Sequence, residues 1–219
     1  MAQTATGPSG PSRADLQRRR VVSESVEIFS RRGFRATSMN EIAAVVGLSK
    51  PTLYHYFRSK EQLLVRMYTD VLDESLEQGH ETVAAATSPL DAVRDLLASR
   101  VVYTCRKQAV LKVCFEEEHE LPEELLAQVL DRRRAFEDLL VTALHEHLES
   151  YPGIDLQMTP SVFANMCLGA VNWCYKWYQP AGPTSPEELG RQMARSLTAS
   201  IDPATAVQER SARRVVTTG

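Results

Sequence analysis

The segment from Thr37 to Lys60, TSMNEIAAVVGLSKPTLYHYFRSK, restricts the fold of this chain more than any other segment. Ser38 can cap a helix that starts at Met39, and Glu41 three residues later completes a capping-box pattern. Gly47 supplies the left-handed residue that commonly ends a helix. We therefore expect a short first helix, and its buried stripe is predicted to be Ile42, Val45 and Val46.

A second helix follows the glycine turn almost at once. Ser49 is its predicted cap, and Pro51 falls in its first turn, where the missing N–H group costs nothing. Ser59 and Gln62 repeat the start pattern for a third helix, so the second one is confined to Lys50–Arg58. Two short helices joined by a glycine turn are the pattern of a helix-turn-helix.

The second helix has one apolar face and one free face. At about 100° per residue, Leu53 and Phe57 share the apolar side. The free side suits the major groove of DNA, where a threonine offers a methyl group or a hydroxyl to a base edge. It consists of Pro51, Thr52 and His55, flanked by Tyr54 and Tyr56.

An arginine-rich helix is predicted before this segment, over residues 13–32, and Gly33 ends it. Its apolar residues include Val22, Val26 and Phe29. We expect three helices of this size to pack as a tripod around Val26, Phe29, Ile42, Val45, Leu53 and Phe57.

Charge is distributed unevenly along the chain, although the net charge is only −3. Residues 1–60 hold ten Lys and Arg against four Asp and Glu, whereas the remainder holds fifteen against twenty-four. A basic N-terminal domain on an acidic body is what an oriented binder of double-stranded DNA should have.

The segment GFRATSMNEIAAVVGLSKPTLYHYFRSKEQLL resembles the N-terminal DNA-binding domain of the TetR (tetracycline-repressor-like) family, without a gap from about Val21 to Leu64. The resemblance implies a homodimeric regulator, most often a repressor, that binds a palindromic operator in the cytoplasm. It also implies that phosphates and bases are contacted by Thr37, Ser38, Ser49, Lys50, Pro51, Thr52, Tyr54, His55, Tyr56 and Lys60.

The rest of the chain is predicted to be helical, which makes the fold class all-α. The expected organisation is a disordered tail over 1–12, a DNA-binding domain over 13–60, an effector-binding and dimerisation domain over 61–202, and a loose tail over 203–219. Breaks are expected at Gly79 and in three proline-containing turns. The predicted helices of the body cover 59–78, 88–106, 108–118, 122–150, 159–179 and 185–201.

Two of these helices are candidates for the dimer contact. The helix over 159–179 is apolar on nearly every side, so it is buried in its own chain or pressed against a second copy. The final helix carries a stripe of Leu189, Met193, Leu197 and Ile201. The family resemblance implies that the last two long helices pair with those of a partner as a four-helix bundle.

The body also has a candidate effector site. NWCYKWYQPAGPTSPEEL resembles the C-terminal part of TetR regulators of fatty-acid, steroid or aromatic-acid degradation, which respond to acyl-CoA thioesters. The steroid-type members have an arginine where this chain has Gly169. The predicted effector contacts are Phe115, Phe136, Leu139, Met166, Trp173, Lys176 and Trp177, with Lys112, Arg132 and Arg133 as further cations for phosphate.

Three alternatives remain at this stage. Cys167 and Cys174 lie two helical turns apart and could form a thiol sensor, although buried thiols are the simpler interpretation of all four cysteines. A regulator that needs its ligand to bind DNA would have the same sequence features. The third is a di-iron bundle enzyme built on Glu77-x-x-His80 and Glu116-x-x-His119, with Glu137 or Glu146 as further ligands.

We expect no catalytic residue, metal or cofactor, because no metal-binding Cys or His spacing is present and the carboxylates near the Glu-x-x-His pairs form a solvated run. The first residues lack the apolar run of a signal peptide, and no stretch is long enough to cross a membrane. The sequence therefore favours a cytoplasmic DNA-binding regulator over an enzyme.

Overall fold

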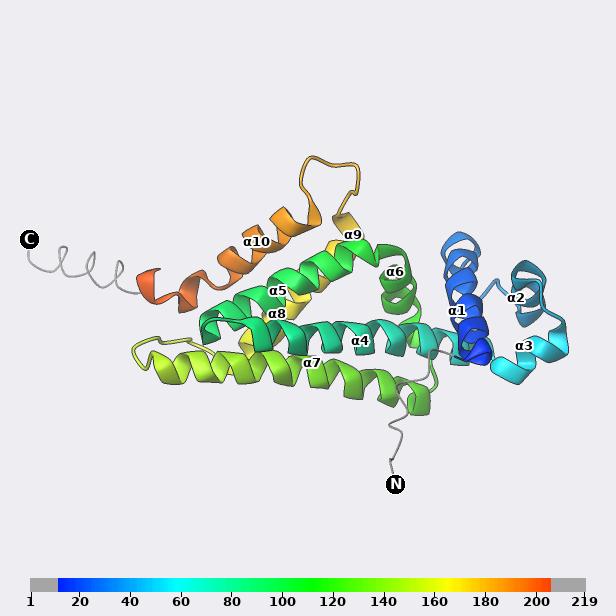
Figure 1. Cartoon of the computed structure of the whole chain (residues 1–219), viewed down its shortest axis with the longest axis horizontal. Coiled ribbons are helices and arrows are strands. Elements are labelled where there is room, and N and C mark those ends of the chain that lie inside the picture. Colours follow the sequence, from blue (N-terminus) through cyan, green and yellow to red (C-terminus); the bar gives the residue numbers. More distant parts are fainter. Residues whose placement is uncertain (1–11, 206–219) are drawn as a thin grey trace, which may run out of the picture.

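The computed structural model describes residues 12–205, which form an all-α structure as predicted, without a strand among them (Figure 1). The two predicted tails lie largely outside the described residues. In chain order the helices are α1 (Arg13–Arg32), α2 (Met39–Val46), α3 (Lys50–Tyr56), α4 (Lys60–Ala85), α5 (Pro89–Arg106), α6 (Gln108–Glu117), η1 (Glu118–Glu120), α7 (Glu123–Ser150), α8 (Pro160–Asn172), α9 (Cys174–Trp177), α10 (Pro186–Leu197) and η2 (Ala199–Ile201).

Helices α1, α2 and α3 form a head at one end of the molecule, and the remaining helices form an elongated body (Figure 1). The rings of Phe29 and Phe34 meet edge to face at 5.0 Å, above the buried side chains of Ile42, Leu53 and Phe57. The predicted place of Val45 in this core is wrong, because its side chain is 55% exposed. Ile42 and Val46 are buried as predicted, and Met39 and Ala43 complete the buried face of α2.

Local capping fixes the helix boundaries in the head. The Ser38 hydroxyl accepts from the Glu41 amide at 3.3 Å, while the Glu41 carboxylate accepts from the Ser38 amide at 2.8 Å. Gly47 then takes the left-handed conformation at φ 70°, as predicted. Helix α3 ends at Tyr56, two residues earlier than expected, because the backbone of Phe57 is already extended.

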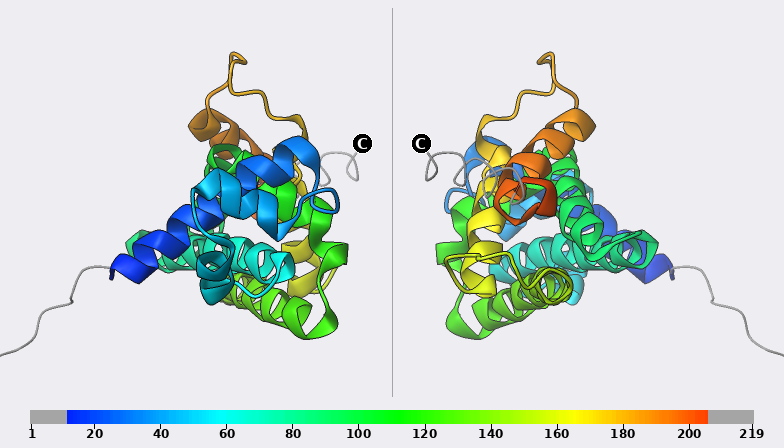
Figure 2. Two further views of the ribbon diagram at one scale, coloured as in Figure 1. Left: turned by 90° about the vertical axis from the view of Figure 1, so that its right-hand side faces the viewer. Right: turned by 90° about the vertical axis from the view of Figure 1, so that its left-hand side faces the viewer.

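One hydrophobic cluster extends from the head into the body. Buried side chains continue from Phe57 in the head through Leu63 and Tyr68 on α4 to Leu111 on α6. Helix α1 also packs against α6. A second cluster fills the space between α5, α7, α8 and α10, which lie beside one another in the end views (Figure 2). The head is therefore attached to the body by packing as well as by the chain.

The predicted helix break at Gly79 is absent, since α4 runs through it to Ala85. Gly79 is buried, and a Cβ atom there would lie 3.0 Å from Leu139 and 3.2 Å from Phe136, both on α7. The glycine therefore permits a close approach of two long helices rather than ending one of them.

The predicted C-terminal helices are shorter than expected. The helix expected over 159–179 divides at Trp173 into α8 and the short α9, and the final helix ends at Leu197 before the 3₁₀ turn η2. The stripe of Leu189, Met193 and Ile201 packs into the core of its own chain, where α10 crosses α5. No helix within residues 12–205 combines the length and the apolar character needed to span a membrane.

Candidate functional site

Helix α3 presents most of its free face to solvent. Lys50, Pro51, Thr52, Tyr54 and His55 are all exposed, whereas Leu53 between them is fully buried and anchors the helix. The Thr52 hydroxyl lies 2.7 Å from that of Ser49, and the Thr52 amide donates to the same Ser49 oxygen at 3.3 Å. The cap thus fixes the position of the Thr52 hydroxyl at the start of the helix.

A hollow of about 470 Å³ lies beside this face, between the start of α2, helix α3 and the start of α4. Four basic residues line it, namely Arg35, Lys50, Arg58 and Lys60. The size and charge of the hollow suit the phosphate backbone of DNA. Sequence reasoning did not select Arg35 and Arg58, although both are basic residues directly beside the predicted helices.

Besides the capping Ser38 and Ser49, three of the predicted contact residues have other partners in the structure. Thr37 is only 2% exposed, and its hydroxyl donates to the Gly33 carbonyl at 2.8 Å. The Lys60 ammonium donates to the carbonyls of Phe34 and Arg35 at 2.8 and 3.2 Å. Tyr56 packs partly on the head core, so these three side chains support the surface around α3.

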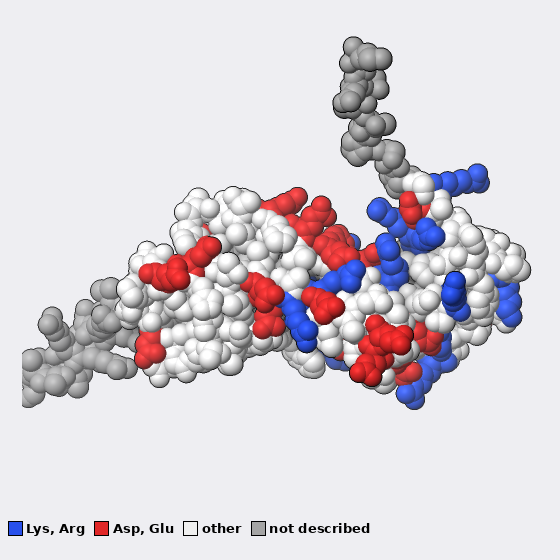
Figure 3. Space-filling view, turned by 90° about the horizontal axis from the view of Figure 1, so that it is seen from below, with Lys and Arg blue, Asp and Glu red and all other residues white. Residues whose placement is uncertain are grey.

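Charge separates along the molecule as the sequence predicts. Seen from below, Lys and Arg side chains gather toward the end that carries the head, while Asp and Glu are spread along the body (Figure 3). The excess of basic over acidic residues in the first 60 positions therefore faces outward at one end. Such a field orients the head toward DNA.

A second site is a cavity of about 330 Å³ in the body, between α4, α5, α6, α7 and α8, with the exposed Asn165 and Gly169 on its rim. Its walls combine apolar side chains with polar and charged ones, a composition typical of small-molecule sites. The lining residues are Leu72, Arg100, Phe115, Arg133, Phe136, Glu137, Asn165, Leu168, Gly169 and Asn172.

The cavity brings together only part of the predicted effector set. Phe115 and Phe136 line it, and Leu139 packs beside it against Gly79. Met166, Trp173 and Trp177 lie outside it, with 48%, 57% and 47% of their surface exposed. The indoles are therefore neither cavity lining nor core.

Three predicted cations of the body are already paired. Lys176 forms an ion pair with Glu116 at the surface, and the Nε of Arg132 donates to the Asp73 carboxylate at 2.7 Å. Arg133 pairs with Glu118 and with the hydroxyl of the buried Tyr68, and its guanidinium lies 5.7 Å from the ring centre of Phe115. Sequence reasoning missed Arg100, which lines the same cavity. The sequence feature that could have identified Arg100 is its place within the apolar stretch LLASRVVYTC.

The geometry supports neither the thiol sensor nor the di-iron site. All four cysteines are buried, and desolvation raises the pKa of Cys105 and Cys167 to about 11 and that of Cys174 to about 12. Because only thiolates react readily, these thiols are inert near neutral pH.

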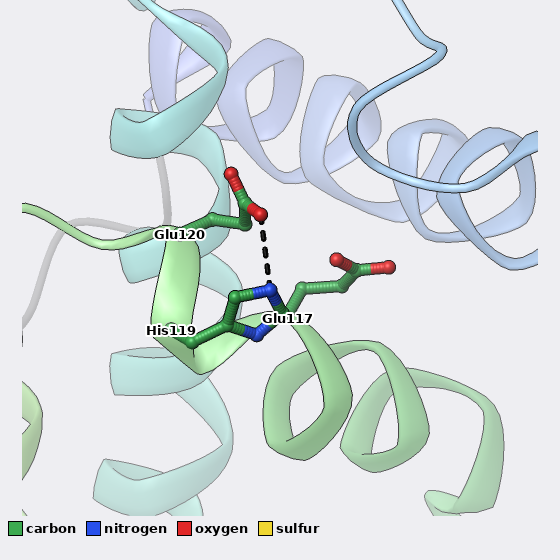
Figure 4. Close-up of side chains that lie close together, drawn as sticks. All are labelled: Glu117, His119 and Glu120. Atoms are coloured by element: carbon green, nitrogen blue, oxygen red, sulfur yellow. Dashed lines mark ion pairs between the residues drawn. The ribbon is translucent and has the colours of Figure 1, made fainter.

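The two Glu-x-x-His pairs do not form a bundle site, since Glu77 and His80 both face solvent. Within residues 12–205, the side chains close enough to share a metal ion are Glu117, His119 and Glu120 (Figure 4). This group lies at the surface, and His119 Nε2 is 3.0 Å from the Glu120 carboxylate. Glu120 also pairs with Arg35, so the group belongs to the contact between body and head.

A helix-turn-helix head on an all-helical body with an internal cavity defines a DNA-binding transcriptional regulator. Comparison with known families agrees with this class. The C-terminal domain of tetracycline-repressor-like proteins matches residues 86–201, and the bacterial regulatory proteins of the tetR family match residues 21–67. The chain therefore belongs to the TetR family, and it is a regulator rather than an enzyme.

Individual relatives extend over most of the chain. The transcriptional repressor KstR2 of Mycolicibacterium smegmatis is 27% identical over 191 residues, which cover 84% of this chain and 90% of the relative. The structure of AibR in complex with isovaleryl coenzyme A and operator DNA is similar with a TM-score of 0.72 and 27% identity, over 82% of this chain and 97% of AibR. PfmR from Thermus thermophilus is similar with a TM-score of 0.73 and 25% identity, over 81% and 96% of the two chains.

Proposed function

We propose that this protein is a homodimeric repressor that binds a palindromic operator and is released when an acyl-CoA thioester places its acyl group in the internal cavity. It acts in the cytoplasm, where its DNA target is. The proposal rests on the course of α4. This helix contributes Leu72 to the cavity and begins at Lys60 beside α3, the recognition helix proposed to enter the major groove.

The proposed DNA contacts follow from the exposed face and the basic hollow. Thr52, His55 and Pro51 face the bases, whereas Ser38, Ser49, Lys50 and Tyr54 face phosphates together with Arg35 and Arg58. Thr37, Tyr56 and Lys60 contribute mainly by holding this surface in shape, because their polar groups or rings are already engaged.

The proposed dimer contact lies on α8 and α9. Val162, Met166, Trp173 and Trp177 form an exposed apolar face on these helices, and a lone protomer would leave it in water. The stripe on α10 is used within its own chain, so α10 would add only its outward side to the contact. A two-fold dimer presents two heads to the two halves of a palindrome.

The effector class is supported by the cavity and by a relative. The cavity is too small for a whole CoA thioester, so only the acyl group would enter, between Phe115, Phe136 and Leu72. AibR is a similar protein known in complex with isovaleryl coenzyme A and operator DNA. Lys112 on α6 is the proposed partner for the CoA phosphates outside, together with Arg132 on α7, which would exchange its pairing with Asp73 for a phosphate.

Release would follow from a shift of α4. Because an effector in the cavity touches α4 directly, it favours a position of that helix that differs from the DNA-bound one. The two recognition helices then no longer match the spacing of the half-sites, and affinity falls.

Binding of the full chain to the DNA upstream of its own gene tests the proposal. Fluorescence anisotropy would be recorded with and without a panel of acyl-CoA thioesters, with free CoA as the control. We expect tight binding without ligand and release by one thioester at micromolar concentration. Tight binding that no thioester weakens would remove the effector class, and binding only in the presence of a thioester would make the ligand a co-repressor instead.

A further inference from the structure

Arg100 is a buried cation in the wall of the internal cavity. It lies on α5 with 5% of its surface exposed. Its Nε donates to Asn172 Oδ1 at 2.8 Å, and its Nη1 donates to Ser75 Oγ at 2.6 Å. Its guanidinium also lies 5.2 Å from the ring centre of Phe136. The side chain is therefore held in one place between α4, α7 and α8.

No acidic side chain of the described residues pairs with Arg100. Both of its hydrogen-bond acceptors are neutral, and desolvation lowers the pKa of its guanidinium to about 10, which still leaves it charged at neutral pH. A buried charge without a counter-charge is strongly unfavourable, so such groups are normally paired.

The other charged groups of the cavity are already engaged. Arg133 is neutralised by Glu118. The carboxylate of Glu137 accepts from the side chain of Asn165 at 2.6 Å and does not reach Arg100. Of the two cations that line the cavity, Arg100 is thus the one without an acidic partner.

One nitrogen of Arg100 remains available to a ligand. Its Nη2 has no hydrogen-bond partner within residues 12–205, and it is not one of the fully enclosed polar atoms that lack a partner. Because Arg100 lines the cavity, this N–H group is open toward it. Nη2 and Nη1 together present the fork that binds a carboxylate through two parallel hydrogen bonds.

We propose that Arg100 is the anion-binding residue of the cavity and that the effector group entering it ends in a carboxylate. This inference rests on the proposed function and narrows its effector class. One guanidinium matches one carboxylate, whereas a phosphate would require further cations. The apolar walls at Leu72, Phe115 and Leu168 then enclose the hydrocarbon part.

Two pairs of probes test the inference by isothermal titration calorimetry on the full chain. Hexanoyl-CoA and adipoyl-CoA differ only in a terminal methyl or carboxylate. The second pair, 1-hexanol and hexanoate, lacks CoA and differs in a terminal hydroxymethyl or carboxylate. We expect the carboxylate member of at least one pair to bind roughly 10- to 100-fold more tightly. The pair that shows this preference tells whether the acid arrives as a thioester or free.

Variants assign the preference to Arg100. Arg100→Met should reduce the ratio of the two affinities within a pair to about one. Arg100→Lys retains the charge without the fork and should leave part of the preference. Arg106→Met is the matched control, because Arg106 lies on the same helix but pairs with Glu187 at the surface. Helix content and thermal midpoint of each variant show whether it is folded.

Equal affinities within both pairs, including no measurable binding of either member, would overturn the inference. So would a preference that survives in folded Arg100→Met. Operator release is measured on the same samples. Release by thioesters without a carboxylate preference leaves the proposed function standing and removes the role of Arg100. Binding that depends on Arg100 but leaves the operator occupied supports the site and removes ligand-released repression.

Discussion

Gly190 marks the closest approach between α10 and α5. A Cβ atom at this position would lie 2.7 Å from the carbonyl oxygen of Ala98, and backbone atoms cannot move aside as a side chain can. We expect Gly190→Ala to lower the free energy of unfolding by about 1–3 kcal/mol. Chemical denaturation measures this change.

Gly169→Ala is the matched control for that substitution. Gly169 also lies in a helix, but a Cβ atom there would meet nothing within 4 Å. Alanine should therefore stabilise α8 by about 0.5–1 kcal/mol. If both variants changed stability in the same direction, the close approach at Gly190 would not be the cause.

Thr52 is the residue whose role in sequence recognition is simplest to isolate. Its amide and hydroxyl both contact Ser49, and the residue lies on the exposed side of α3. We expect Thr52→Ala to relax specificity at one operator position by about 1–3 kcal/mol. Selection of bound sequences from a randomised operator measures this. Thr142→Ala, on α7, should leave the selected sequence unchanged, and an unchanged profile for Thr52→Ala would remove Thr52 from the base contacts.

The buried thiols give a prediction on pH. Because burial raises the pKa of Cys105, Cys167 and Cys174 to between about 11 and 12, their thiolate fraction stays very small at pH 8 and grows only as the pH approaches those values. Iodoacetamide should therefore label the native protein much more slowly than the unfolded one at pH 8. Fast native labelling of Cys167 and Cys174 would restore the thiol-sensor interpretation.

At the scale of helices and turns, sequence reasoning succeeded where the signal is local. Ser38, Gly47 and Ser49 act within one turn of the residues they cap, so their positions could be predicted. The role of Gly79 could not be predicted, because its neighbours on α7 are about sixty residues away in sequence. The cavity could not be predicted either, since it forms only when residues from five helices meet.

A short link joins the body to the head at η1. Glu120 on η1 pairs with Arg35, which also lines the basic hollow. The hydrogen bond from Arg35 lowers the pKa of Glu120, so the pair persists at neutral pH and weakens only as the pH falls through the low pKa of that carboxyl. In the DNA-bound state, a phosphate would compete with Glu120 for pairing with Arg35.

Glu120→Gln should therefore raise operator affinity, by roughly two- to fivefold, because it frees Arg35 for the DNA. Glu117→Gln removes the same charge from the neighbouring turn but has no ion pair with Arg35. It is the control for a general charge effect. Equal gains in both variants, measured by fluorescence anisotropy, would count against a specific link through Arg35.

At the scale of the whole molecule, the basic head predicts a steep dependence of operator binding on salt. Each phosphate contact contributes about −0.9 to the slope of log K against log salt concentration. If two heads bind one operator, Lys50→Met removes one such contact from each head. The slope should then become shallower by about 1.8 units, against about 0.9 for a single head.

Lys112→Met provides the comparison, since Lys112 is an exposed lysine on α6 of the body. It should leave the slope unchanged. Anisotropy titrations between about 50 and 200 mM salt give the slope for both variants. The effect of phosphate contacts on affinity is large over this range. A change near 0.9 for Lys50→Met would contradict the dimer.

Gly79 also has a mechanical consequence. Because the missing side chain at Gly79 lets Phe136 and Leu139 of α7 approach α4 there, Gly79 is a natural fulcrum for a rigid rotation of α4. Ser75, which Arg100 holds at the cavity, lies about 6 Å along the helix from this fulcrum, whereas Lys60 lies about 28 Å from it. A movement of about 1 Å at Ser75 then becomes about 5 Å at Lys60. A cavity that barely changes shape can in this way separate two heads from their half-sites.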